Sequence, residues 1–279
     1  MAKPLLRINF FFIFILFNNC VIKEKVYEKY DLPKKLHEIS GLEFYKNNLI
    51  GFNDSGNLPI IYILDDRFNV VDEIKINCEN IDWEDITYDG INYYISDLGN
   101  NYGNRQNLRI LKFDKSFKFL KSLNIKYTNQ IFFDKDTLNQ FDSEALVSYK
   151  NKLIIFSKNR KNLTSELYLV DKENEFQSLS KVNSFNSSSL ITGGDYSGDL
   201  DTLILIGYNF LREHKLFIFN NFDLNSMLNP LIIPLGFLEG KQVESLKFKS
   251  KNEIIIASEG EKSNKPEIWK INLKKLYEN

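Results

Sequence analysis

The sequence predicts an all-β protein, and within that class a β-propeller of five blades. Short runs of β-branched and aromatic residues, bounded by Gly, Asn and Asp, occur throughout the chain after residue 20, and no stretch there shows sustained helical periodicity. One arrangement of paired strands repeats at spacings of 44 to 60 residues, the length of a propeller blade. A chain of 279 residues with 43% hydrophobic content can bury the core of one large domain of this kind.

The first nineteen residues have the composition of a signal peptide. Lys3 and Arg7 form a positive region, and an apolar run of ten residues follows from Ile8 to Phe17. Ten residues are too few to cross a bilayer as a helix, which needs about twenty. We therefore expect residues 1–19 to be removed from the mature protein.

Cys20 follows this apolar run directly, at the place of the acylated first residue of a bacterial lipoprotein. The match is imperfect, because Asn19 replaces the small residue that usually precedes such a cysteine. Residues 21–279 are expected to form a single domain, anchored by the lipid of Cys20 on the periplasmic or surface face of the cell envelope, or secreted if Cys20 is not acylated. With Cys78 as the only other cysteine, no internal disulfide is expected in the mature chain.

Each repeat opens with a small or acidic motif on one strand, followed by a turn and a second apolar strand that ends in polar residues. The five segments are Glu38 to Asp54, Trp83 to Asp97, Ser143 to Lys158, Gly194 to Tyr208 and Val243 to Glu259. The apolar residues on which they align, 44, 60, 50 and 50 positions apart, are Leu42, Ile86, Leu146, Tyr196 and Leu246. This spacing accommodates four short antiparallel strands and their loops.

A third strand with alternating apolar positions follows each pair, and in most repeats a fourth follows it. The predicted third strands are Ile60 to Leu64, Leu108 to Phe113, Leu167 to Val170, Leu216 to Phe219 and Glu267 to Ile271. The predicted outer strands are Val70 to Ile76, Lys121 to Tyr127, Gln177 to Val182 and Leu231 to Leu235. No segment remains to supply the last outer strand, so we expect Lys25 to Leu32 to pair there and close the ring, which removes an open sheet edge.

Two other arrangements remain open at this point. A sixth blade would exist if the long segment from Ser116 to Asp142 forms a degenerate repeat. A β-sandwich would also contain short strands, but it does not predict a phased repeat.

The first strand of a propeller blade lines the central channel, so residues at one phase of the repeat form a ring. Two positions before the aligned apolar residues stand Ser40, Glu84, Glu144, Gly194 and Glu244, with Asp85 and Asp195 one position later. At the ends of the second strands stand Asp54, Asp97, Lys158, Tyr208 and Glu259. The sequence thus predicts a ring of acidic residues at one mouth of the channel.

Three glutamates at one phase repel each other unless a cation or protons neutralise them. Carboxylates suit Ca²⁺, which takes six to eight oxygen ligands in flexible geometry. The candidate metal ligands are Glu84, Glu144, Glu244, Asp54, Asp195 and Glu259. The alternative is that these acids accept hydrogen bonds from neighbouring backbone N–H groups and hold the blades in register.

Basic residues follow the second strands of successive repeats, where they could hold an anionic ligand above a metal ion or pair with acids of the rim. The candidate ligand-binding residues are Asp97, Arg105, Lys158, Arg160, Tyr208 and Arg212, with Lys161 beside them. A net charge of -1 argues against a nucleic-acid partner, which requires a concentrated basic face. We expect a monomer that meets the membrane through its lipid alone.

Several motifs together resemble uncharacterised β-propeller lipoproteins of the Bacteroidetes and, more distantly, the SdiA-regulated and esterase-like phytase propellers. These motifs are Glu38 to Leu42 (EISGL), Asn53 to Gly56 (NDSG), Asp82 to Ile86 (DWEDI), Ser96 to Asn101 (SDLGNN), Ser143 to Leu146 (SEAL) and Thr192 to Tyr196 (TGGDY). The resemblance covers about residues 36 to 275 and implies an extracytoplasmic propeller with calcium binding and no settled reaction.

Two functions of different classes fit these observations. The first is a binding module that presents its charged mouth to a polar or anionic ligand or a surface protein, with Ca²⁺ as a bridge. The second is a metal-dependent hydrolase of phosphate or carboxylic esters, in which Glu84 or Asp85 is the base. A purely architectural scaffold is a third reading.

Overall fold

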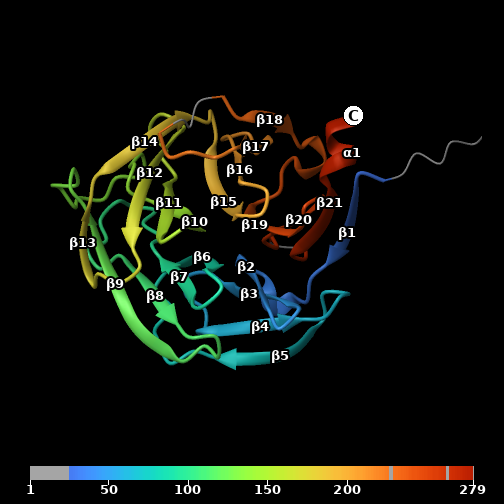
Figure 1. The fold of residues 1–279 in the computed structure, drawn as a ribbon, viewed down its shortest axis with the longest axis horizontal. Coiled ribbons are helices and arrows are strands. Elements are labelled where there is room, and N and C mark those ends of the chain that lie inside the picture. Colours follow the sequence, from blue (N-terminus) through green and yellow to red (C-terminus); the bar gives the residue numbers. More distant parts are fainter. Residues whose placement is uncertain (1–24, 226–228, 262–263, 279) are drawn as a thin grey trace, which may run out of the picture.

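The computed structural model describes residues 25–225, 229–261 and 264–278, and it confirms the predicted five-bladed β-propeller. Five antiparallel sheets surround a central axis, with β2, β6, β10, β15 and β19 nearest to it (Figure 1). The segment from Ser116 to Asp142 contains one strand, β9 (Phe119–Tyr127), which is the outer strand of the second blade, so it forms no sixth blade.

Each blade is read from the axis outward. The first blade is β2 (Ile39–Tyr45), β3 (Asn48–Asn53), β4 (Ile60–Leu64) and β5 (Val70–Lys75), and the second is β6 (Trp83–Tyr88), β7 (Tyr93–Asp97), β8 (Arg109–Phe113) and β9. The third blade is β10 (Ser143–Tyr149), β11 (Lys152–Ser157), β12 (Thr164–Asp171) and β14 (Lys181–Asn186). The fourth is β15 (Leu190–Ser197), β16 (Thr202–Tyr208), β17 (His214–Asn220) and β18 (Leu231–Pro234). The fifth blade is β19 (Val243–Ser250), β20 (Glu253–Ser258), β21 (Glu267–Asn272) and β1 (Tyr27–Asp31). Short helices η1 (Lys34–Leu36), η2 (Gly236–Leu238) and α1 (Leu273–Glu278) complete the described elements.

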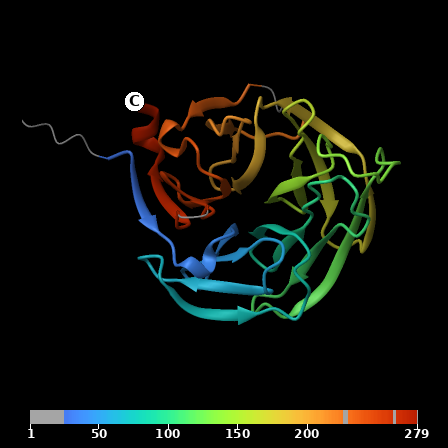
Figure 2. The same ribbon diagram turned by 180° about the vertical axis from the view of Figure 1, so that it is seen from behind.

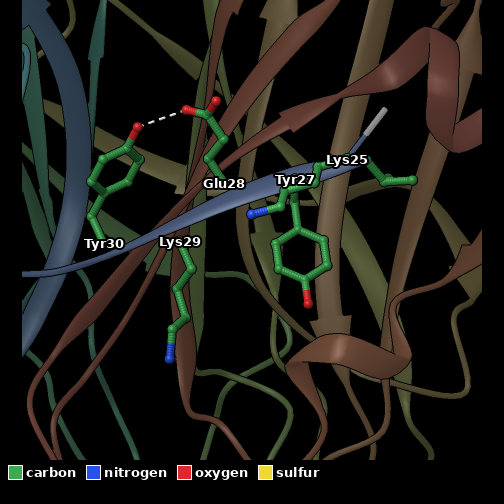
Figure 3. Close-up of a pocket in the computed structure, with 6 residues that line it drawn as sticks. Lys25, Tyr27, Glu28, Lys29 and Tyr30 are labelled. Atoms are coloured by element: carbon green, nitrogen blue, oxygen red, sulfur yellow. Dashed lines mark hydrogen bonds between the residues drawn. The ribbon is translucent and has the colours of Figure 1, made fainter. Parts of the chain in front are cut away.

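Strand β1 closes the ring as the sequence predicts. It pairs antiparallel with β21, from Tyr27 opposite Ile271 to Asp31 opposite Glu267, and Figure 2 shows β1, in blue, beside the C-terminal elements, in red, from behind. Side chains of β1 alternate between its two faces, and Tyr30 donates a hydrogen bond of 2.6 Å to Glu28 (Figure 3). The ring of Tyr27 stacks on Phe237 with centroids 4.1 Å apart, which ties the closing strand to the connection between the fourth and fifth blades.

One predicted outer strand is wrong. The segment Gln177 to Val182 is divided between two blades: β13 (Phe176–Leu179) adds in parallel to β9 of the second blade, and β14 begins at Lys181 as the outer strand of the third. The sequence pattern of this short run does not show where one strand ends and the next begins. Both halves are outer strands with exposed positions, so their apolar residues mark no boundary.

The apolar core consists of clusters packed between adjacent blades. One cluster joins the second and third blades through Ile110, Leu123, Leu146 and Tyr168, all at most 2% exposed. Stability therefore comes from close packing of facing sheets, and Cys78 is a free thiol. Among the described residues no helix is long and apolar enough to cross a membrane.

Candidate metal centre

A β-bulge near the start of every inner strand sets the geometry of the channel mouth. In β6, Trp83 pairs with Asp97 and Asp85 with Ser96, which leaves Glu84 outside the ladder. The same break in register leaves out Glu144 in β10 and Glu244 in β19. A bulge bends its strand and re-aims the extra side chain, so the three predicted glutamates share one structural position.

The register corrects the sequence alignment of the fourth blade. Its bulge lies between Ile191 and Gly193, so Thr192, and not Gly194, is the equivalent of the glutamates. Where the bulge position holds no acid, its side chain forms a hydrogen bond to the next blade instead. The Ser40 hydroxyl donates to the carbonyl oxygen of Glu84, and the Thr192 hydroxyl donates to that of Val243 at 2.7 Å. A hydroxyl therefore ties blades together where the acidic ring is interrupted.

Carboxylate oxygens of Glu84, Asp142 and Glu144 lie within 4.8 Å of one another, and all three residues are buried. Asp142 is not among the residues predicted from the sequence. Its signal is nonetheless present, because Asp142 precedes Glu144 by two residues as Asp82 precedes Glu84. We call Glu84, Asp142 and Glu144 the carboxylate trio.

A buried lysine and a partly buried arginine pair with the trio. Lys158, which is 5% exposed, forms an ion pair with Glu144, and Arg160 forms one with Asp142. The ammonium of Lys158 lies 5.7 Å from the ring centroid of Tyr208, whose hydroxyl donates to Glu244 at 3.2 Å. Lys158, Arg160 and Tyr208, predicted as ligand-binding residues, are thus brought together with the acids of the mouth.

The environment raises the pKa of several of these carboxyl groups. Burial, with the nearby carboxyls, raises the pKa of Glu84 well above its usual range and does the same for Glu144, although Lys158 opposes it there. Burial and neighbouring carboxyls also raise the pKa of Asp54 to about 7 and that of Glu259 to about 9. A cation would relieve this repulsion.

The pKa of Lys158 moves in the opposite direction to that of an isolated buried lysine. Burial alone would lower it, but the carboxyls of Glu144 and Glu244 raise it well above its usual range. Lys158 therefore remains charged inside the channel mouth.

One detail favours a ligand inside the trio. The second carboxylate oxygen of Glu144, Oε2, is buried and has no hydrogen-bond partner among the described residues. Gly99 approaches so closely that a Cβ there would stand 2.1 Å from Oε1 of Glu84 and 2.3 Å from Cγ of Asp82. Any other residue at this position would overlap the acids themselves, so Gly99 allows the carboxylates to lie against the backbone.

Asp85 and Asp195 have a different role from the trio. Asp85 accepts hydrogen bonds from the N–H of Ile86 at 2.8 Å and, in the next blade, of Leu146 at 2.9 Å. Asp195 accepts from Phe248 of the next blade at 3.0 Å. These acids hold neighbouring inner strands in register, which is the alternative that the sequence left open for them.

Asp195 also takes part in an ionic cluster separate from the trio. The ammonium of Lys247 lies 2.9 Å from Asp195 and 2.6 Å from Glu43, and all three side chains are largely buried. Glu43, Asp195 and Lys247 share one phase of the inner strands, three residues beyond the bulge. We call this position the second layer of the channel. The sequence alignment did not show it, because it placed Asp195 directly after the glutamate position in the fourth repeat.

Two further predicted basic residues, Arg105 and Arg212, pair with acids. Arg105 and Arg109 both lie 2.9 Å from the carboxylate of Asp97, which is fully buried. Arg212 pairs with Glu261 at the rim. The structure thus assigns these side chains to the ion pairs that the sequence offered as the alternative to an anion site.

Comparison with known proteins gives the fold and no family. No protein-family model matches this chain, and no curated protein sequence does. Among solved structures, a β-1,3-galactosidase of glycoside hydrolase family 43 with galactodeoxynojirimycin is 11% identical, with a TM-score of 0.53 over 87% of this chain and 93% of that one. An exo-β-1,3-galactanase from Phanerochaete chrysosporium with galactose is 11% identical, with a TM-score of 0.56 over 84% of this chain and 59% of that one. At such identity the likeness shows a shared β-propeller fold and nothing of activity.

Proposed function

We propose that this protein is a ligand-binding β-propeller whose channel mouth holds a divalent cation of the Ca²⁺ type at the carboxylate trio. The observation that carries the proposal is the unpartnered, buried Oε2 of Glu144, in a group of three carboxylates whose oxygens lie within 4.8 Å of one another. A buried carboxylate oxygen without a donor is costly, and a hard cation is the partner that oxygen ligands of this kind accept.

The charges near the trio are consistent with a cation and not with an anion. Three carboxylates face two basic groups, Lys158 and Arg160, and each basic group is already paired with one acid. Beyond the trio, Asp54, Glu244 and Glu259 add further carboxyls to the mouth. The hydrolase alternative assigns the base to Glu84 or Asp85, and Asp85 instead accepts hydrogen bonds from the N–H groups of Ile86 and Leu146.

Titration calorimetry of the purified, metal-stripped protein tests this proposal. We expect Ca²⁺ to bind, and at one hundred times its dissociation constant to stabilise the fold by about 2.7 kcal/mol. Glu144→Gln should weaken binding at least tenfold, because it removes the charge and half of the oxygen ligands of that side chain. Glu28→Gln, an exposed acid of β1, is the matched control and should bind as the unchanged protein does. Absence of Ca²⁺ binding to the unchanged protein would overturn the proposal.

We also propose that the protein is anchored to a membrane through Cys20. This cysteine and the predicted signal peptide lie outside the described residues, so the proposal rests on the sequence. Expression in bacteria fed a radioactive or alkyne-bearing fatty acid should label the unchanged protein and leave Cys20→Ser unlabelled, while Cys78→Ser, the matched control, keeps its label. Equal labelling of Cys20→Ser and the unchanged protein would refute the anchor.

A further inference from the structure

Large apolar side chains are exposed on loops around the acidic mouth. They belong to the connections that follow β3, β7, β9 and β16, all of which lie at the end of the blades where the bulges occur. These side chains, between 53% and 76% exposed, are Leu58, Tyr102, Ile131, Phe132, Leu138, Phe210 and Leu211. We call this set the apolar rim. Exposed apolar residues gathered around a polar centre are typical of an interaction site.

The longest loop of the rim is held in place by hydrogen bonds. Asn139 donates to the carbonyl oxygens of Asn100 at 3.3 Å and Asn101 at 3.1 Å. Gln130 donates to the carbonyl oxygen of Gly103 at 2.7 Å. The loop after β9 is therefore fixed to the loop after β7, and its apolar side chains are presented in an ordered position at low entropic cost to a partner.

A cavity of about 310 Å³ opens in this loop beside the mouth. Its lining combines the apolar side chains of Phe132, Leu138 and Phe141 with the carboxylates of Asp134 and Asp136. Lys161 is the basic residue among those that line it. Apolar walls with two acids suit a side chain with an aliphatic stem and a positive end, as in lysine or arginine.

We propose that the mouth face docks a basic, apolar segment of a partner protein. Positive side chains of that segment would reach the carboxylates of the cavity, and its apolar side chains would cover the rim. The charge complementarity rests on Asp134 and Asp136, which are exposed and outnumber Lys161 among the residues that line the cavity. Complementary charge would also speed the encounter at low salt.

A bilayer is a less suitable occupant of the same face. Asp31 and Glu267 stand at the mouth end of the fifth blade, and Tyr27 lies at the opposite end of β1. In the lipid-anchored form proposed above, Cys20 precedes Lys25 by five residues, which extend at most about 18 Å. The anchor would thus hold the opposite face towards the membrane, and the carboxyls of the mouth would repel anionic lipid headgroups.

Fluorescence anisotropy with labelled synthetic peptides tests this inference. The probes are three ten-residue peptides of alternating Lys and Phe, Lys and Ser, and Glu and Phe, offered to the purified protein in EDTA and in Ca²⁺. We expect the Lys-Phe peptide to bind at least tenfold more tightly than the other two, and more weakly as salt increases. Equal binding of Glu-Phe or Lys-Ser peptides would overturn the inference, because charge and apolar contact are both required.

Substitutions locate the binding surface. Phe132→Ser with Asp134→Asn should weaken the Lys-Phe peptide at least tenfold. Phe176→Ser, an equally exposed aromatic residue on β13 at the outer edge, should leave binding unchanged. Binding of anionic vesicles that is lost in the Phe132→Ser, Asp134→Asn variant would overturn the protein partner in favour of a membrane. Peptide binding in EDTA separates this inference from the cation proposal, since each can fail without the other.

Discussion

Replacing Lys158 by Met is expected to destabilise the protein by about 3–5 kcal/mol at pH 8. The ammonium of Lys158 is buried, pairs with Glu144 and lies against the ring of Tyr208. Its removal leaves a buried carboxyl that has to take up a proton or remain as an uncompensated charge. Both states cost free energy, and the packing of a Met side chain of similar length recovers little of it.

Urea unfolding of the single and double variants measures this effect. Lys158→Met combined with Glu144→Gln should recover most of the lost stability, because a buried ion pair replaced as a whole is nearly neutral while a broken one is not. The matched control is Lys265→Met, whose partner Asp31 lies 2.9 Å away with both side chains more than half exposed; it should change stability by less than about 0.5 kcal/mol. Equal losses for Lys158→Met and Lys265→Met would show that the Lys158 pair is no more important than a surface pair.

Five blades and their closure follow from the sequence because the repeat is enforced by packing. Each inner strand must place an apolar residue such as Leu146 or Leu246 against the neighbouring sheet, both 1% exposed, so the apolar pattern keeps its phase along the chain. The closing strand was predictable for the same reason. Only the segment Lys25 to Leu32 was left to cover the outer edge of the last blade.

The register inside a blade was not predictable in the same way. A bulge adds one residue without changing the apolar pattern on either side, so the fourth repeat can be aligned on Tyr196 with Gly194 in the glutamate position. The structure instead leaves Thr192 outside the ladder. As a result Asp195 was assigned to the acidic ring, whereas it lies beside Lys247 in the second layer.

Pairing between charged side chains of the loops was the other part that the sequence did not predict. Glu144 lies in β10 and Lys158 directly follows β11 of the same blade, so their contact could be anticipated from the repeat. Asp142 and Arg160 lie in loops before and after those strands, where no pattern fixes a direction. The trio was therefore recognised in part, through its two glutamates, and completed only by the fold.

In the cation-free protein, stability is expected to fall as pH rises from 5 to 9. Burial and the nearby carboxyls raise the pKa of Glu259 to about 9 in the folded state, whereas an unfolded glutamate titrates near its ordinary value. Between these two values the folded protein binds a proton that the unfolded chain has lost, so each pH unit costs about 1.4 kcal/mol for such a group. The stability that Glu259 contributes is complete below the unfolded pKa and lost as pH approaches the folded one.

Thermal unfolding of Glu259→Gln in EDTA isolates this contribution. Glutamine resembles the protonated glutamate, so the variant should match the unchanged protein at pH 5 and exceed its melting temperature by several degrees at pH 8. Glu239→Gln, an exposed acid near η2, should leave the pH dependence as it is. A Glu259→Gln variant that retains the full decline between pH 5 and 9 would mean that Glu259 is ionised in the mouth at neutral pH, and that its charge is already balanced by the basic groups of the channel.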